Sequence, residues 1–133
     1  GGPAAPSAGG PGELSESANG VSVQITDARV HPAAAGGGEL TMTVHNSGSV
    51  PEHLALVLPA GGGQATVQDP TAPGAGVTQA GVLLKPGSTT TFGAQGPRVL
   101  LQGAPLPPAG QSLTVKLEFG VLGMVTLQAP VTP

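Results

Sequence analysis

The chain has 133 residues, among them 23 Gly and 15 Pro, with no Cys, Trp or Tyr and a formal net charge of −3. The absence of Cys excludes disulfides, zinc–thiolate sites, iron–sulfur clusters and thiol nucleophiles. Four basic residues are too few for a phosphate-binding surface, so we expect no nucleic-acid partner. No apolar run approaches the roughly 18 residues of a membrane-spanning helix.

The first eighteen residues differ from the rest in composition. They read GGPAAPSAGGPGELSESA, and eight of them are Gly or Pro. This predicts a flexible tether over residues 1–18 and one folded domain over residues 19–133. The segment also resembles the spacer that follows the lipid-bearing Cys of exported bacterial lipoproteins. That resemblance implies an extracytoplasmic protein, lipid-anchored through a residue upstream or secreted, whereas a disordered tail of any other protein is the alternative.

Alternation with a period of two begins after this segment. Val21, Val23 and Ile25 share one face, as a half-buried strand requires. After Asp27 the apolar phase shifts to Ala28, which predicts a β-bulge.

Two further strands follow. Leu40, Met42 and Val44 alternate with polar residues, and turn residues come next at 46–49. The segment 54–58 is more uniformly apolar, and we expect it to be covered on both faces.

The rest of the chain contains short strands and Pro- or Gly-rich connections, with no helical stripe. Short strands are expected near 65–68, 77–84, 88–92 and 99–102, and a final hairpin pairs 113–119 with 124–129. Eight or nine short strands indicate an all-β, antiparallel sandwich or barrel with an aliphatic core. The residues expected in that core are Leu40, Met42, Val44, Leu56, Leu113, Val115, Leu117 and Phe119.

No catalytic motif is present. The chain has no GxSxG nucleophile elbow and no GK[ST] phosphate loop, so we expect no enzyme.

A metal site would have to use His and Met. Thioether and imidazole groups suit Cu(I), and His45, His53 and Met42 are weak candidate ligands. Met42 is in phase with the apolar residues of its strand, which favours the core instead. The turn after His45 could bring His53 near it, although two surface imidazoles are the simpler interpretation.

Four segments, in order, resemble sequence motifs of the periplasmic copper chaperone family, PCuAC. They are Glu39–Leu54 (ELTMTVHNSGSVPEHL), Gly81–Thr91 (GVLLKPGSTTT), Gly96–Gly103 (GPRVLLQG) and Gly110–Val125 (GQSLTVKLEFGVLGMV). The resemblance implies a cupredoxin-like, immunoglobulin-like Greek-key sandwich outside the cytoplasmic membrane. It also implies a link to the delivery of Cu(I) towards cytochrome c oxidase.

The metal motif of that family is not matched. Its first His falls on Gln68, its Met falls near Gln79, and its HxM falls on Arg98 and Leu100. An amide oxygen is a hard ligand, and a guanidinium has no lone pair to donate. The chain therefore resembles diverged actinobacterial lipoproteins that keep the sandwich and lack the copper ligands.

The resemblance and the missing ligands together predict a protein-interaction module at the outer face of a membrane. The expected partner is an envelope or respiratory membrane complex, with a possible link to oxidase assembly, and no cofactor is expected. The alternative is a copper-binding chaperone with substitute ligands, drawn from His31, His45, His53, Met42 and Met124.

Overall fold

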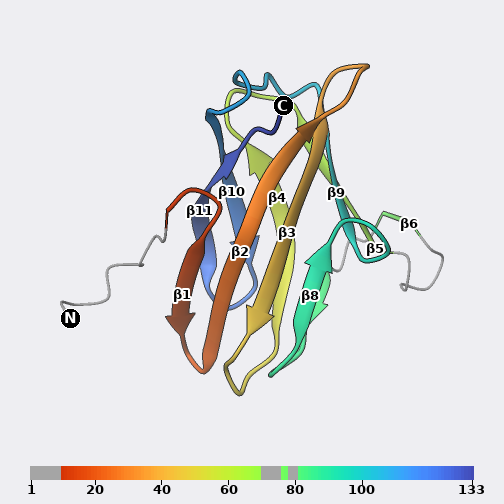
Figure 1. Cartoon of the computed structure of the whole chain (residues 1–133). Helices are drawn as coiled ribbons and strands as arrows, with labels where there is room; N and C mark the ends of the chain where they lie inside the picture. Colours follow the sequence, from red (N-terminus) through yellow and green to blue (C-terminus); the bar gives the residue numbers. More distant parts are fainter. Residues whose placement is uncertain (1–9, 70–75, 78–80) are drawn as a thin grey trace.

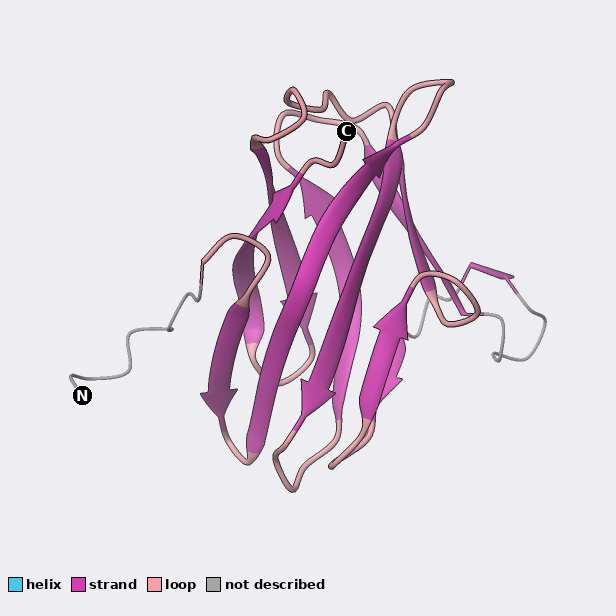
Figure 2. Ribbon diagram, in the orientation of Figure 1, coloured by secondary structure: helices cyan, strands magenta, loops and turns pink. Residues whose placement is uncertain are grey.

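Two antiparallel β-sheets pack face to face in the computed structural model, which describes residues 10–69, 76–77 and 81–133 (Figures 1 and 2). The first sheet contains β1 (Leu14–Ala18), β2 (Val21–Pro32), β3 (Gly38–Asn46), β5 (Gln64–Asp69), β6 (Gly76–Val77), β8 (Thr89–Phe92) and β9 (Arg98–Gln102). The second contains β4 (Glu52–Pro59), β7 (Val82–Leu84), β10 (Ser112–Phe119) and β11 (Gly123–Pro130). The predicted all-β antiparallel sandwich is therefore confirmed.

The strand order places β3 at the centre of the larger sheet. That sheet runs β1-β2-β3-β9-β5-β6, and β8 pairs with the part of β3 that β9 leaves open. The smaller sheet runs β11-β10-β4-β7 and lies behind the larger one in Figure 1. None of the described residues forms a helix long and apolar enough to cross a membrane.

The predicted bulge in β2 is confirmed. The pairing of β2 with β3 shifts register between Thr26 and Arg29, and Asp27 takes a positive φ of 55°. The extra residue turns Ala28 and Val30 towards the core, where both are buried.

The N-terminal prediction is wrong in its second half. Within the expected tether of residues 1–18, β1 pairs along its whole length with β2, and Leu14 is only 7% exposed. Gly12 is hydrogen-bonded to both β2 and β11. Backbone hydrogen bonds to β2 and one buried side chain, Leu14, hold this edge strand in place. The otherwise polar segment LSESA can therefore form a strand. Residues 1–9, which were also assigned to the tether, lie outside the described residues.

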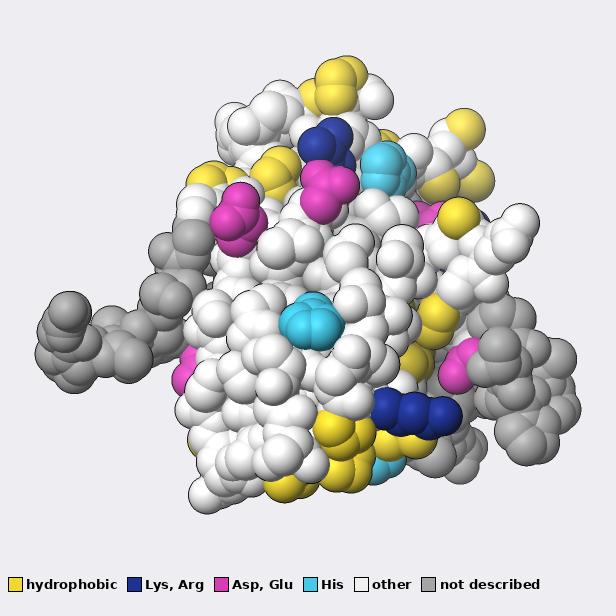
Figure 3. Space-filling model, turned by 60° about the horizontal axis from the view of Figure 1, so that its bottom comes forward, with side chains coloured by type: hydrophobic (Ala, Val, Ile, Leu, Met, Phe, Trp, Pro, Cys, Tyr) yellow, Lys and Arg dark blue, Asp and Glu magenta, His cyan; other side chains and the backbone are white. Residues whose placement is uncertain are grey.

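The core is aliphatic, as expected, with Phe92 and Phe119 as its aromatic side chains. The outward face of the larger sheet is polar, and Figure 3 shows that broad surface largely free of hydrophobic side chains. Seven of the eight predicted core residues are buried, namely Leu40, Met42, Val44, Leu113, Val115, Leu117 and Phe119.

Leu56 is the exception, because it is 50% exposed on the outer face of β4. Phe119 pairs with Leu54 and Glu118 pairs with Leu56, so Ala55 is an extra residue in β4. This bulge reverses the side-chain phase of the strand. As a result Leu56 points outward. The expectation that both faces of residues 54–58 are covered is wrong for the described residues of the single chain.

Candidate functional site

Three of the four positions at which the family resemblance places metal ligands lie side by side on β5 and β9. Gln68 is the cross-strand partner of Arg98, and Leu100 follows two residues later on β9. Val99, between them, is completely buried, so Arg98 and Leu100 both face away from the core. The fourth position, Gln79, lies outside the described residues.

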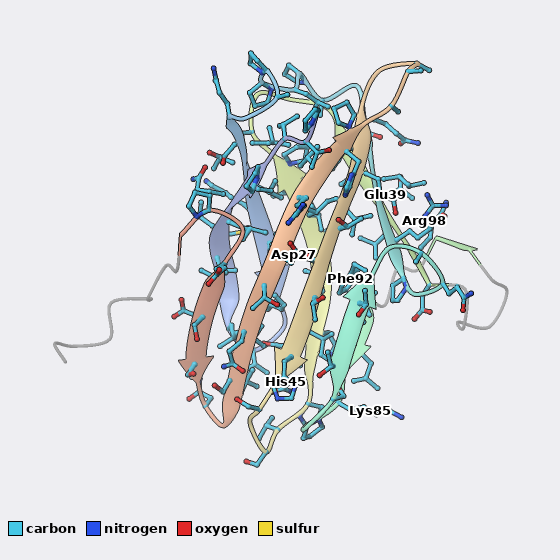
Figure 4. The ribbon with its side chains drawn as sticks, viewed as in Figure 1. Asp27, Glu39, His45, Lys85, Phe92 and Arg98 are labelled. Atoms are coloured by element: carbon cyan, nitrogen blue, oxygen red, sulfur yellow. The ribbon has the colours of Figure 1, made fainter. Side chains whose placement is uncertain are left out.

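Arg98 does not stand free at this rim. Its guanidinium donates two hydrogen bonds to Glu39 of β3, one of them from Nε to Oε2 at 3.0 Å, and Figure 4 shows the two side chains pointing toward each other. The hydrogen bond from Arg98 lowers the pKa of Glu39, partial burial of the carboxylate acts in the opposite direction, and the charges of Arg98 and His31 add to the lowering. The same bond raises the pKa of Arg98.

The chemistry of this rim differs from that of a copper site. Arg98 contributes a permanent positive charge, Leu100 contributes only carbon, and Gln68 contributes a neutral hard oxygen. Arg98 also engages both oxygens of the Glu39 carboxylate. A bound cation here would meet a fixed guanidinium and no soft donor.

The candidate histidines lie on opposite sides of the sandwich. His45 faces outward from β3, where its Nδ1 is 2.9 Å from Thr89 Oγ1 (Figure 4). His53 is exposed on β4, which belongs to the other sheet. Because the chain crosses between the sheets after β3, the intervening turn separates these two imidazoles. The structure does not bring them together.

The remaining candidate ligands are also dispersed. Met42 is buried between the sheets. His31 lies on the larger sheet, where its Nε2 is hydrogen-bonded to Thr41 Oγ1 at 2.9 Å. Met124 is exposed on β11, on the same outer face as His53. No group of three or more His, Asp or Glu side chains within the described ranges could hold a metal ion.

An open cavity of about 720 Å³ lies between the β2 bulge and the C-terminal residues, lined in part by Asp27, Arg29 and Val131. Asp27 and Arg29 are well exposed and form an ion pair with each other at 2.8 Å. Because their charges remain in water, this cavity offers no desolvated group that would activate a substrate.

Two buried polar residues were missed by the sequence analysis. Asn46 donates to the backbone carbonyls of Val50 and Leu84, and Glu52 accepts hydrogen bonds from the β10–β11 turn. Both are completely buried. Each lies two residues from a core leucine or valine, so the strand phase alone could have identified them as inward-facing.

The architecture and the rim together define a cupredoxin-like β-sandwich whose described rim positions, Gln68, Arg98 and Leu100, hold no soft metal ligand. Among solved structures, it is similar to an apo PCuAC domain from PmoF1, with a TM-score of 0.73, 22% identity, and coverage of 90% of this chain and 99% of that one. A copper-bound PCuAC domain from PmoF2 gives a TM-score of 0.70 and 23% identity, covering 89% of this chain and 97% of that one. An apo PmoF2 PCuAC domain gives 0.68 and 27%, covering 83% and 89%.

The chain therefore has the fold of PCuAC domains, and the resemblance seen in its sequence is confirmed. No family model matches the sequence, and no curated protein matches it either.

Proposed function

We propose that this chain is an extracytoplasmic, non-enzymatic PCuAC-type sandwich that acts through protein contacts and does not carry Cu(I). The observation that carries the proposal is the Arg98–Glu39 ion pair, which stands at a position where the family resemblance places a copper ligand. We further propose that a lipid attached upstream of residue 1 holds the domain at a membrane. Its partner there is an envelope or respiratory complex, with a role in oxidase assembly.

A second candidate is Cu(I) binding by substitute ligands. Of the five side chains considered, His53 and Met124 share the outer face of the smaller sheet, which is the observation that favours this function. Two ligands leave the coordination shell of Cu(I) incomplete. This candidate is therefore the weaker of the two.

The test is a competition titration of Cu(I) against a chromophoric chelator under reducing conditions. We expect the wild type to lose Cu(I) readily to the chelator. A triple variant, Gln68→His with Arg98→His and Leu100→Met, restores soft donors on two paired strands and should bind about 100-fold more tightly. Arg98→Gln serves as the control, because it removes the charge and adds no soft ligand.

Two results would overturn the proposal. Tight, stoichiometric binding by the wild type would show that the chain is a copper carrier after all. If His53→Ala or Met124→Ala then abolished that binding, the site would lie on the smaller sheet. Equal binding by the triple variant and the control would show that these positions do not converge on one site.

A further inference from the structure

The outward faces of the two sheets differ sharply in polarity. The larger sheet presents mostly polar and charged side chains outward, whereas the smaller sheet presents four large apolar side chains among polar ones such as His53, Thr126 and Gln128. Throughout the described residues, every exposed large hydrophobic side chain lies on the smaller sheet or on the turn between β10 and β11. These side chains are Leu56 (50% exposed), Leu58 (45%), Leu83 (46%), Val121 (38%) and Met124 (50%).

Four of them lie on the outward face of the smaller sheet, which we call the apolar face: Leu56, Leu58, Leu83 and Met124. Strand register places Leu56 and Met124 on either side of Glu118 in one row across β4, β10 and β11. In the next row, Leu58 lies beside Lys116. Large apolar side chains gathered on one outward face of a sheet mark an interaction site on a soluble protein.

Two opposite charges lie within this surface. Lys116 and Glu118 are two residues apart on β10, so they point to the same side of the sheet. The ion pairs among the described residues are Arg29–Asp27 and Arg98–Glu39, and neither includes Lys116 or Glu118. The apolar face therefore carries one positive and one negative side chain, each without an ionic partner in the described chain.

We propose that the apolar face is the contact between two copies of this chain, related by a twofold axis. The axis lies in the plane of the interface, runs perpendicular to the strands, and passes over Leu117 of β10. This operation places Lys116 against the partner's Glu118, and it makes the same contact a second time by symmetry. It also places Leu56 against the partner's Leu58. The pattern of charges is thus complementary to itself, which an unrelated partner would not require.

The size of the surface indicates which class of interface it can form. Three strands of about 27 Å and β7 of about 10 Å, spaced about 4.8 Å apart, present roughly 440 Å² on each copy. The total of about 900 Å² is just below the roughly 1,000 Å² of a specific, stable interface. Two sheets can pack on each other in this way with their strands nearly aligned. We therefore expect a weak dimer whose population depends on concentration.

The experiment is sedimentation velocity on the wild type and on charge variants from about 10 µM to about 1 mM, a range that reports weak dissociation constants. Lys116→Glu places like charges opposite each other twice, so it should raise the dissociation constant by more than about tenfold, and so should Glu118→Lys. The double exchange, Lys116→Glu with Glu118→Lys, restores both pairs and should dimerise as the wild type does. Lys85→Glu makes the same charge change on the β7–β8 turn and should have no effect.

Recovery in the double exchange supports the proposal, since a merely damaged surface would not recover. A wild type that stays monomeric up to about 1 mM would overturn it and leave the apolar face to another protein or to lipid. A wild-type dimer that none of the charge variants weakens would overturn the twofold geometry. These outcomes are distinguishable from those of the copper titration, because none of the charge variants, at Lys116, Glu118 and Lys85, replaces a candidate copper ligand.

Discussion

Replacing Glu52 with Gln tests whether one buried carboxylate holds the β10–β11 hairpin in place. Its Oε1 accepts hydrogen bonds from the backbone N–H groups of His53 and Val121, both at 2.8 Å. Its Oε2 accepts from Val121 at 3.0 Å and from Leu122 at 2.8 Å. Glu52 is completely buried, so these three donors are satisfied by the carboxylate and not by bulk water.

The expected loss of stability follows from the number of N–H groups that donate to the Glu52 carboxylate. A Gln side chain has one oxygen, so it can satisfy the donors on one side while its NH₂ group faces the other. In either orientation one of the three N–H groups, that of Leu122 or that of His53, loses its acceptor, and the remaining bonds lose the assistance of a charge. Hydrogen bonds to a charged group contribute about 1.5–3 kcal/mol each, so Glu52→Gln should lower the free energy of unfolding by about 2–4 kcal/mol. In a domain of this size the thermal midpoint should fall by about 8–16 °C.

Urea denaturation gives the change in unfolding free energy, and amide hydrogen exchange locates it. Exchange should accelerate most at Leu122 or His53, whichever N–H group faces the NH₂ group of Gln, because Val121 is bonded to both oxygens. Glu13→Gln is the matched control, because Glu13 is exposed and its replacement should change stability by less than about 0.5 kcal/mol. If Glu52→Gln were equally neutral, the carboxylate would not be what holds the turn.

Two further predictions concern the N-terminal strand and the rim. Leu14→Ala should cost about 2 kcal/mol of unfolding free energy in urea, at the lower end for a buried leucine because β1 is an edge strand; no loss would return this segment to a tether. Because Arg98 lowers the pKa of Glu39, this carboxylate should stabilise the fold at pH values above its ordinary pKa of 4.5, and the contribution should be lost as the pH falls through the lowered value. In urea titrations at neutral and acidic pH, Glu39→Gln should cost a little stability at neutral pH and nothing in acid. An equal loss at both pH values would mean that the ion pair is not the cause.

Much of the fold could be predicted because the alternation of apolar and polar residues along a strand identifies its buried face. The phase of Leu40, Met42 and Val44 identifies the inward face of β3, and the phase change after Asp27 identifies the bulge in β2. β1 could not be recognised in the same way. Its only large apolar residue is Leu14, and backbone pairing with β2 does not appear in side-chain composition.

The candidate site was partly predictable for a different reason. Family resemblance aligned Gln68 with Arg98 as lost ligands, and the structure pairs these two residues on β5 and β9. The bond from Arg98 to Glu39 joins residues 59 positions apart, and no local pattern encodes it. The sequence left open whether the turn after His45 brings His53 near it. A turn within one sheet would do that, but this connection passes from one sheet to the other.

The β4 strand shows why one error in the sequence prediction bears on function. LALVL is apolar in both phases of alternation, so its composition cannot determine which side chains face the core. The bulge at Ala55 determines it, by turning Val57 inward and Leu56 and Leu58 outward. A strand that is apolar on both faces normally has cover on both faces. Within one chain, the described residues cover only the inner face of this strand. A second copy packed on the apolar face would cover the other, and both phases of the sequence would then have a physical cause.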